Sequence, residues 1–299
     1  MRIGTVGAWL GGLAVARSAD ARAAAAAVEE AGYGCLWVPE GLGTREAIAN
    51  SGVLLAATER ITVATGIANI WARDAVAAAC AYRVLDDAYP GRFVLGLGVS
   101  HPVQVDPRGH RYARPVATMR AYLEAMDDMT VESPDASAKD VPQPRVPRLL
   151  AALRPRMLAL SAELADGAHT YLVPVAHTVR AREALGPERT LAVELAVVLE
   201  TDPGTARARA RDHLAWYVGT PNYADNLRWL GYGEEDLANG CSDRLVDDLV
   251  AWGDEAAIRT RIDEHRAAGA DHVALQPLGT PGDPLGVEEL RRLAAAVTA

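Results

Sequence analysis

The stretch Phe93-Val-Leu-Gly-Leu-Gly-Val-Ser-His101 indicates the fold of this chain most directly. It follows the turn Tyr89-Pro-Gly-Arg92 and begins as an uninterrupted apolar run, which is typical of a strand buried on both faces of a parallel sheet. In parallel α/β folds, catalytic and binding residues collect at the carboxyl ends of strands. Ser100 and His101 follow such an end, so we expect one wall of a site there. Alternatively, Gly96 and Gly98 only relieve crowding and His101 caps a loop.

Similar short apolar segments recur along the chain and alternate with helical patterns. Besides the strand that begins at Phe93, the expected strands cover residues 2–9, 35–38, 61–65, 148–153, 168–172, 191–199 and 271–278. Eight strands that alternate with helices fit a (β/α)8 TIM barrel better than an open sheet. Thr44 and Asp74 are expected to cap the second and third helices.

The barrel is expected to form a single domain over residues 1–299, because α/β barrels of this size commonly do. Residues 129–147 are expected to be an irregular excursion, since they include four prolines. The aromatic-rich segment 218–242 is expected to be a lid or an interface insertion, and a packing insert is the alternative.

Composition excludes several classes of partner and compartment. The formal net charge is −9 and no basic run occurs, which argues against nucleic acid and against an anionic membrane as partners. No apolar stretch reaches membrane-spanning length, and the N-terminus runs straight into a strand-like segment rather than a signal peptide. We therefore expect a cytoplasmic globular protein.

Cysteine, histidine and lysine usage excludes further chemistry. The three cysteines show no CxxC pair and the seven histidines show no HExxH spacing, so neither a disulfide framework nor a metal site is expected. Lys139 is the only lysine and lies in a Pro-rich polar loop. Schiff-base catalysis and a Walker-type lysine, which need a placed amine, are nearly excluded.

Polar and aromatic residues follow most of the expected strands. Those that would line one barrel mouth are Trp9, Glu40, Asn69, Ser100, His101, Arg154, Thr170 and Tyr171. Glu40 follows an apolar strand and a proline, so partial desolvation would suit it to acid/base work. Its alternative role is to cap the next helix or to pair with Arg45. Arg154 precedes Pro155 at a helix start and is a candidate anion clamp, unless it is a plain surface arginine.

The glycines of the central strand do not make a dinucleotide fingerprint, because no third glycine follows Gly96 and Gly98 at the right interval. A Rossmann fold is therefore not expected.

Several stretches together resemble the luciferase-like monooxygenase superfamily, and within it the branch that uses the deazaflavin coenzyme F420. The matching stretches are Gly32-Tyr-Gly-Cys-Leu-Trp-Val-Pro-Glu40, Ala56-Ala-Thr-Glu-Arg-Ile-Thr-Val-Ala-Thr-Gly-Ile-Ala-Asn69, Tyr89-Pro-Gly-Arg-Phe-Val-Leu-Gly-Leu-Gly-Val-Ser-His101 and Glu163-Leu-Ala-Asp-Gly-Ala-His-Thr-Tyr-Leu172. The resemblance implies a bacterial-luciferase-like TIM barrel, usually a homodimer, with an isoalloxazine-like ring in the barrel mouth.

The resemblance also implies roles for individual residues. Gly66-Ile67 matches the family's non-prolyl cis peptide, which backs the ring. Glu40 matches an acid/base position, and His101 lies near a position that is acidic in some relatives and would position substrate or ring. The implied cofactor contacts are Trp9, Thr65, Gly66, Ile67, Asn69, Gly98, Ser100, Gln104, Arg154, Thr170 and Tyr171, of which Thr170 and Tyr171 would help to hold the phosphate tail.

One departure from the family pattern concerns the turn after the fifth strand, where relatives commonly have glycine and this chain has Leu153-Arg154-Pro155. Either Arg154 grips the phosphate, or the cofactor is displaced or absent. The leading hypothesis is an F420-dependent oxidoreductase that transfers a hydride to or from an organic substrate. The alternatives are an FMN-dependent monooxygenase that needs a separate reductase, and a non-catalytic relative that binds a flavin-like ligand or merely dimerises.

Overall fold

Eight parallel strands close into a barrel in the computed structural model, which describes residues 1–131, 141–142 and 144–297. The barrel strands are β1 (Val6–Trp9), β2 (Cys35–Val38), β3 (Thr62–Thr65), β5 (Phe93–Gly98), β8 (Arg148–Ala151), β9 (Gly167–Thr170), β10 (Thr190–Val198) and β12 (His272–Pro277). Each pairs in parallel with the next, and β12 pairs with β1, which closes the ring. The expected TIM barrel is confirmed, with every barrel strand inside or next to its expected range.

Short strands extend this barrel at two places. The strand β4 (Ala68–Asn69) pairs with β5 at the mouth, and β11 (Val250–Trp252) pairs with β10. A separate antiparallel pair joins β6 (Thr130–Val131) to β7 (Val141–Pro142). This pair lies within the expected excursion 129–147, of which residues 132–140 and 143 lie outside the described residues.

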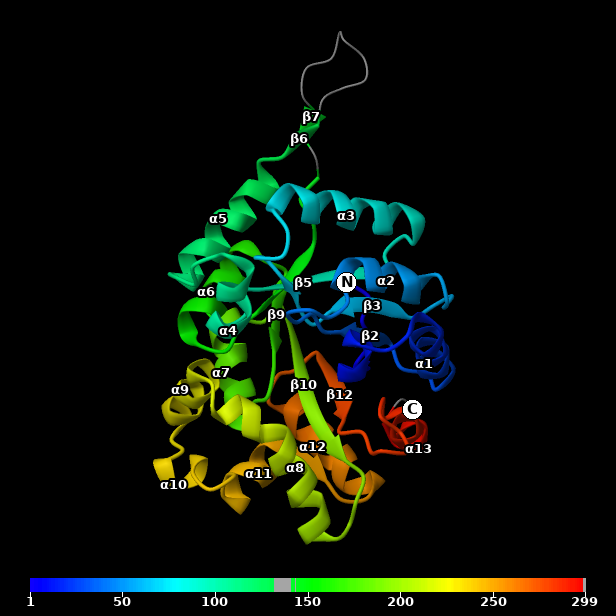
Figure 1. Cartoon of the computed structure of the whole chain (residues 1–299), viewed down its shortest axis with the longest axis vertical. Helices are drawn as coiled ribbons and strands as arrows, with labels where there is room; N and C mark the ends of the chain where they lie inside the picture. The colour runs from blue at the N-terminus through cyan, green and yellow to red at the C-terminus, as the bar shows by residue number, and fades with distance from the viewer. Residues whose placement is uncertain (132–140, 143, 298–299) are drawn as a thin grey trace.

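Helices surround the barrel, and Figure 1 shows α8 to α11 gathered at one end of the molecule, on the side away from α3. The helices are α1 (Ser18–Glu30), α2 (Ala47–Leu55), α3 (Ala75–Ala88), α4 (Pro102–Val105), α5 (Pro115–Asp127), α6 (Pro155–Leu164), α7 (Val175–Leu185), α8 (Pro203–Val218), α9 (Pro221–Leu230), α10 (Glu234–Leu237), α11 (Asp243–Leu249), α12 (Glu255–Ala267) and α13 (Val287–Val297), with 3-10 turns at η1 (Gly11–Ala14) and η2 (Asp106–Arg108). Within the described ranges, no helix is both long and apolar enough to span a bilayer.

Of the two predicted helix caps, one is confirmed and the other is wrong. Asp74 caps α3, because its Oδ1 accepts a hydrogen bond from the backbone N–H of Ala77 at 2.7 Å. Thr44 does not cap α2, since its hydroxyl is bonded to the backbone of Gly41 instead. Glu46 takes that place and accepts from the N–H of Ala49 at 2.6 Å. The carboxylate of Glu46, two residues after Thr44, accepts from a backbone N–H of the first turn of α2 as well as a threonine hydroxyl would.

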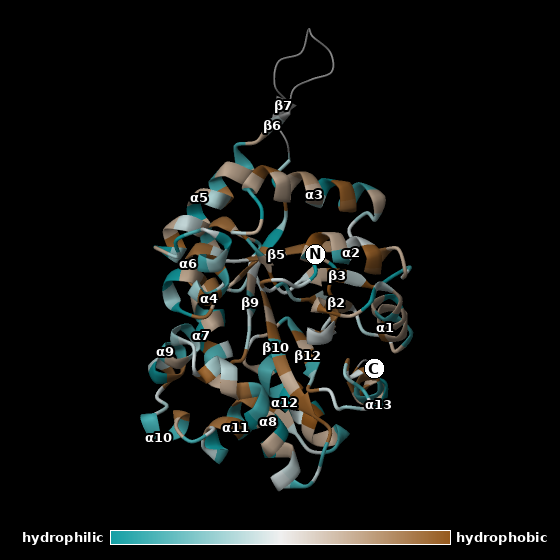
Figure 2. Ribbon diagram, in the orientation of Figure 1, coloured by the Kyte–Doolittle hydropathy of each residue, from teal (hydrophilic) through white to brown (hydrophobic). Residues whose placement is uncertain are grey.

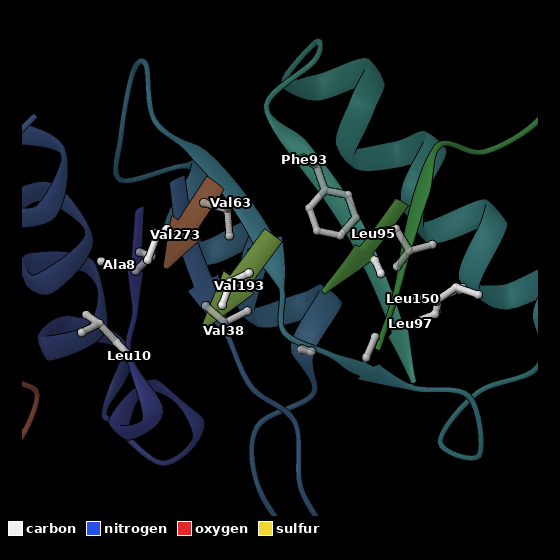
Figure 3. Close-up of a cluster of buried hydrophobic side chains, with 14 of the residues drawn as sticks. Ala8, Leu10, Val38, Val63, Phe93, Leu95, Leu97, Leu150, Val193 and Val273 are labelled. Atoms are coloured by element: carbon white, nitrogen blue, oxygen red, sulfur yellow. The ribbon is translucent and has the colours of Figure 1, made fainter. Parts of the chain in front are cut away.

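The main hydrophobic core lies between the barrel and the helices. Alternate strand residues point outward and pack under the helices, and Figure 3 shows such side chains from β1, β2, β3, β5, β8, β10 and β12. In Figure 2 hydrophobic colours dominate the strands, whereas hydrophilic colours appear on the surrounding helices. Each strand is buried both on this outer face and on the face toward the barrel interior, which explains why the strands are uninterrupted apolar runs in the sequence.

The inside of the barrel contains polar aromatic contacts. Trp37 stacks on His169 with ring centroids 4.3 Å apart, and its indole N–H donates to Nε2 of His272 at 2.9 Å. Nδ1 of His272 then donates to the carbonyl of Gly4 at 2.9 Å, because an imidazole that accepts at Nε2 carries its proton at Nδ1. Burial lowers the pKa of His169 to about 3 and that of His272 to about 4. Both imidazoles are therefore neutral at pH 7.

Candidate active site

The carboxyl ends of the strands bring most of the predicted site residues to one mouth. Trp9 ends β1, Glu40 follows β2, Thr65 ends β3 and Asn69 lies in β4, so these four residues come from adjacent strands. Gly98 ends β5, next to β4, and Ser100 and His101 follow it. The convergence expected from a parallel barrel is therefore present on the side formed by β1 to β5.

Residues 66–69, which follow β3 and include β4, form a compact shelf at the barrel mouth. The peptide bond between Gly66 and Ile67 is cis, as the family resemblance implied. The side chain of Ile67 packs over β5, and a methyl group on Gly98 would lie only 2.4 Å from Ile67 Cδ1, so this position needs glycine. The hydroxyl of Thr65 donates to the carbonyl of Gly96 at 2.7 Å and accepts from its N–H at 2.9 Å. The side chain of Thr65 thus joins β3 to β5 beneath the shelf.

Glu40 holds the shelf from the side of β2. One carboxylate oxygen accepts from the N–H of Asn69 at 2.6 Å, and the other accepts from the N–H of Ala47 at 3.2 Å and from the guanidinium of Arg73. Its side chain is 3% exposed and that of Arg73 is 9% exposed, so this ion pair is buried. Arg73 also donates to the carbonyl of Asn69 at 3.1 Å and pairs with Glu46.

These contacts bear on the two roles considered for Glu40. Both carboxylate oxygens already accept hydrogen bonds from the protein, and one of the donors is the first residue of α2. The partner arginine is Arg73 rather than the expected Arg45, which donates to the carbonyl of Ala16. The contacts favour a positioning carboxylate, and the acid/base role stays a prediction.

A row of aromatic rings lies at the mouth and ends at Trp9, whose indole lies next to Gly66. The ring of His101 lies 5.6 Å from Tyr223 and 5.8 Å from Trp216, centroid to centroid. Tyr171 lies 6.2 Å from Tyr223 and 5.2 Å from Trp9, so the row runs from α8 and α9 to β1. Burial lowers the pKa of His101, which leaves a neutral imidazole facing this row at pH 7.

The predicted phosphate contacts occupy different environments. Thr170 is fully buried at the end of β9, and the hydroxyl of Tyr171 is hydrogen-bonded to that of Tyr217 at 2.7 Å. Arg154 is the N-cap of α6, with a half-exposed side chain 3.7 Å from Asp225 on α9. An exposed pair of this kind contributes little stability, so the guanidinium is free to exchange Asp225 for another anion. A role for these residues in phosphate binding stays a prediction.

Four predicted cofactor contacts carry a buried polar atom that has no hydrogen-bond partner among the described residues. These atoms are Trp9 Nε1, Asn69 Nδ2, Gln104 Oε1 and Thr170 Oγ1. Buried polar groups are normally satisfied, and groups that are not indicate a missing partner. An indole N–H and an amide N–H can donate to carbonyl oxygens, Gln104 can accept an N–H, and the hydroxyl of Thr170 can donate to a phosphate oxygen. The pyrimidine part of an isoalloxazine or deazaflavin ring offers both kinds of ring partner, so these donor and acceptor types suit such a ring with a phosphate tail.

Sequence reasoning missed several residues of this region. Arg73 lies 33 positions from Glu40, and no local pattern links the two. Glu194 lies within the apolar run of β10 and is 1% exposed, with one oxygen accepting from the N–H of Leu172 at 2.8 Å. Burial raises the pKa of Glu194 to about 8. Its place in an otherwise apolar strand was the available signal. Over the described part of the chain, no cluster of three or more metal-ligating side chains occurs.

Comparisons with known proteins agree with this fold. The family model described as luciferase-like monooxygenase matches residues 3–272. A Mycobacterium tuberculosis protein that carries the name of a coenzyme F420-dependent oxidoreductase is 28% identical, over 91% of this chain and 92% of its own.

Two solved structures share the fold. An F420-dependent secondary alcohol dehydrogenase, in complex with an F420-acetone adduct, superimposes with a TM-score of 0.76 at 18% identity over 99% of each chain. The oxygenating constituent of 3,6-diketocamphane monooxygenase from Pseudomonas putida, in complex with FMN, gives a TM-score of 0.70 at 13% identity over 99% of this chain and 98% of that one.

Proposed function

Because the chain belongs to the luciferase-like monooxygenase family, we propose that it is an F420-dependent oxidoreductase that transfers a hydride between the deazaflavin and a small organic substrate. The observation that carries this proposal is the set of unpartnered buried polar atoms of Trp9, Asn69, Gln104 and Thr170. The name of the Mycobacterium tuberculosis relative supports the choice of F420.

Individual residues would have separate roles in binding the cofactor. Trp9, Asn69 and Gln104 would bind the ring, with the Gly66–Ile67 shelf behind it, and Thr170 would help to hold the phosphate tail. When bound, the deazaflavin supplies a carbon centre that accepts or donates a hydride. Glu40 and Arg73 would keep the shelf in place through their buried ion pair.

His101 is the proposed residue in contact with substrate or ring. Its neutral imidazole lies against Tyr223 and Trp216, which leaves it able to donate or accept one hydrogen bond at the substrate oxygen. The aromatic row would exclude water from the reacting atoms. Arg154 would bind the phosphate at the start of α6, where backbone N–H groups already favour an anion. A homodimer is proposed from the family resemblance alone.

An FMN-dependent monooxygenase is the second candidate, and the FMN complex with the same fold is what favours it. The two candidates differ in their use of oxygen, because a deazaflavin does not readily activate it.

A turnover assay separates the two candidates. Reduced F420 should be reoxidised by one or more members of a panel of neutral ketones, enones and amides, at the same rate with and without oxygen. The hydride and one proton then appear in the reduced substrate. Oxygen uptake with reduced FMN, together with no reoxidation of F420, would refute the proposal in favour of the monooxygenase.

A further inference from the structure

A cavity of about 340 Å³ opens beside the barrel mouth, at the carboxyl ends of β1 and β12. Its walls include Gly11 and Gly12 after β1, Gln276 on β12, and Arg209, Asp212 and His213 on α8. Pockets of this size hold small organic molecules. None of these residues belongs to the shelf, to the aromatic row or to the proposed ring contacts.

Two polar side chains of the cavity wall have an atom without a partner among the described residues. Oε1 of Gln276 and Nε2 of His213 are both inaccessible to solvent and accept or donate no hydrogen bond. Gln276 is 7% exposed as a residue. Its amide offers an acceptor and a donor side by side, and the imidazole adds a third position. A buried amide with an unused oxygen at a cavity wall indicates a ligand that completes it.

The charges around the cavity disfavour an anionic ligand. The guanidinium of Arg209 is 2.8 Å from Oε1 of Glu289 and also donates to the carbonyl of Leu278. Burial lowers the pKa of His213 to about 4, so its imidazole adds no positive charge at pH 7. Asp212 contributes a negative charge. A phosphate or carboxylate would meet no unpaired cation among the described lining residues.

The indole of Trp9 stands between this cavity and the shelf. A methyl group on Gly11 would lie 3.1 Å from Cζ3 of Trp9 and 3.6 Å from Nε2 of Gln276. A methyl group on Gly66 would lie 2.6 Å from Nε1 of the same indole. One edge of Trp9 therefore faces the cavity side and another faces the cis peptide, so a ligand in the cavity adjoins the proposed reaction centre.

We propose that the cavity at Gln276 and His213 is a substrate subsite that takes a neutral carboxamide- or lactam-like group and rejects phosphate and carboxylate groups. The amide of Gln276 pairs with the carbonyl and N–H of that group, and His213 supplies a further hydrogen bond. The assignment as a substrate subsite rests on the proposed oxidoreductase function, whereas binding of the amide group does not require a cofactor.

Ligand-observed NMR with benzamide and benzoate, two probes of matched shape, tests the subsite on the full chain without cofactor. Benzamide should bind, and benzoate should bind at least about tenfold more weakly. Gln276→Leu and, separately, His213→Leu should weaken benzamide binding, whereas His110→Leu, at an exposed histidine outside the cavity, should not. Absence of benzamide binding, equal binding of benzoate, or unchanged binding by Gln276→Leu would overturn the subsite.

A competition experiment tests whether the subsite binds the substrate. Benzamide should raise the KM of whichever neutral substrate reoxidises F420, with little effect on kcat. Benzamide that binds at Gln276 without competing would overturn the substrate assignment while leaving a ligand site. If no turnover is found, the oxidoreductase proposal fails on its own assay, and the binding arm still decides the subsite.

Discussion

Lowering the pH from 7 to 5 should destabilise the protein by about 5 kcal/mol, a large part of the 5–15 kcal/mol typical of a folded domain. Burial lowers the pKa of His169 and His265 to about 3 and that of His213 and His272 to about 4. The unfolded chain takes up these protons near pH 6.5, so stability present above that pH is lost as the pH falls. Each histidine costs roughly 2 kcal/mol by pH 5.

Glu194 acts in the opposite direction. Burial raises its pKa to about 8, so the folded state keeps a proton that the unfolded state releases above pH 4.5. Its contribution is full at low pH and is lost as the pH rises through 8, so it offsets roughly 3 kcal/mol of the histidine loss between pH 7 and 5. The difference between the two effects gives the expected net loss.

Urea unfolding at pH 7, 6 and 5 measures this balance, with two variants for which the expected changes in the stability loss have opposite signs. His169→Phe keeps a ring against Trp37 and removes the proton site, so its loss between pH 7 and 5 should shrink by about 2 kcal/mol. Glu194→Gln removes the offset, so its loss should grow by about 3 kcal/mol. His110→Phe, at an exposed histidine, should match the unmodified chain. Equal stability at pH 7 and 5, or identical slopes in all variants, would show that these groups are not buried as described.

Glu40→Gln should lower the free energy of unfolding by about 3 kcal/mol, because it leaves the buried guanidinium of Arg73 without its main partner. The substitution also places an amide NH2 where one carboxylate oxygen now accepts from the N–H of Asn69 or Ala47. The shelf should loosen, so the affinity for the cofactor should fall together with stability.

The matched control is Glu46→Gln, which changes the other carboxylate that pairs with Arg73. Glu46 is 45% exposed and caps α2, so its loss should cost only about 1 kcal/mol and leave cofactor affinity unchanged. Calorimetric stability and cofactor titration of both variants decide the role of Glu40. Loss of turnover with stability and cofactor affinity intact would instead establish Glu40 as the acid/base residue.

The barrel could be predicted because each strand is buried on both faces. Double burial makes a strand an apolar run with turn residues at its ends, as in Phe93–Gly98, and this signal does not depend on distant contacts. The strands β4 and β11 were not predicted. With two or three residues each, they are too short to carry a periodic pattern.

The side of the site formed by β1 to β5 could also be located, because strand ends in a parallel barrel meet at one rim. The partners of individual side chains could not. Arg45 is the arginine nearest to Glu40 in sequence, yet Arg73 is its partner, since the ion pair depends on how two loops meet. The cavity at Gln276 was missed for the same reason, because α8 and the end of β12 come together only in the folded chain.

A fluorescence titration of the purified protein with F420 and, in parallel, with FMN tests the central claim most directly. The account predicts saturable binding of F420, weakened in Glu40→Gln, and no binding of FMN at comparable concentrations. Binding of FMN alone would contradict the F420 assignment. Binding of neither cofactor would contradict the proposed oxidoreductase function and would point to the Leu153-Arg154-Pro155 turn as the change that removed the cofactor site.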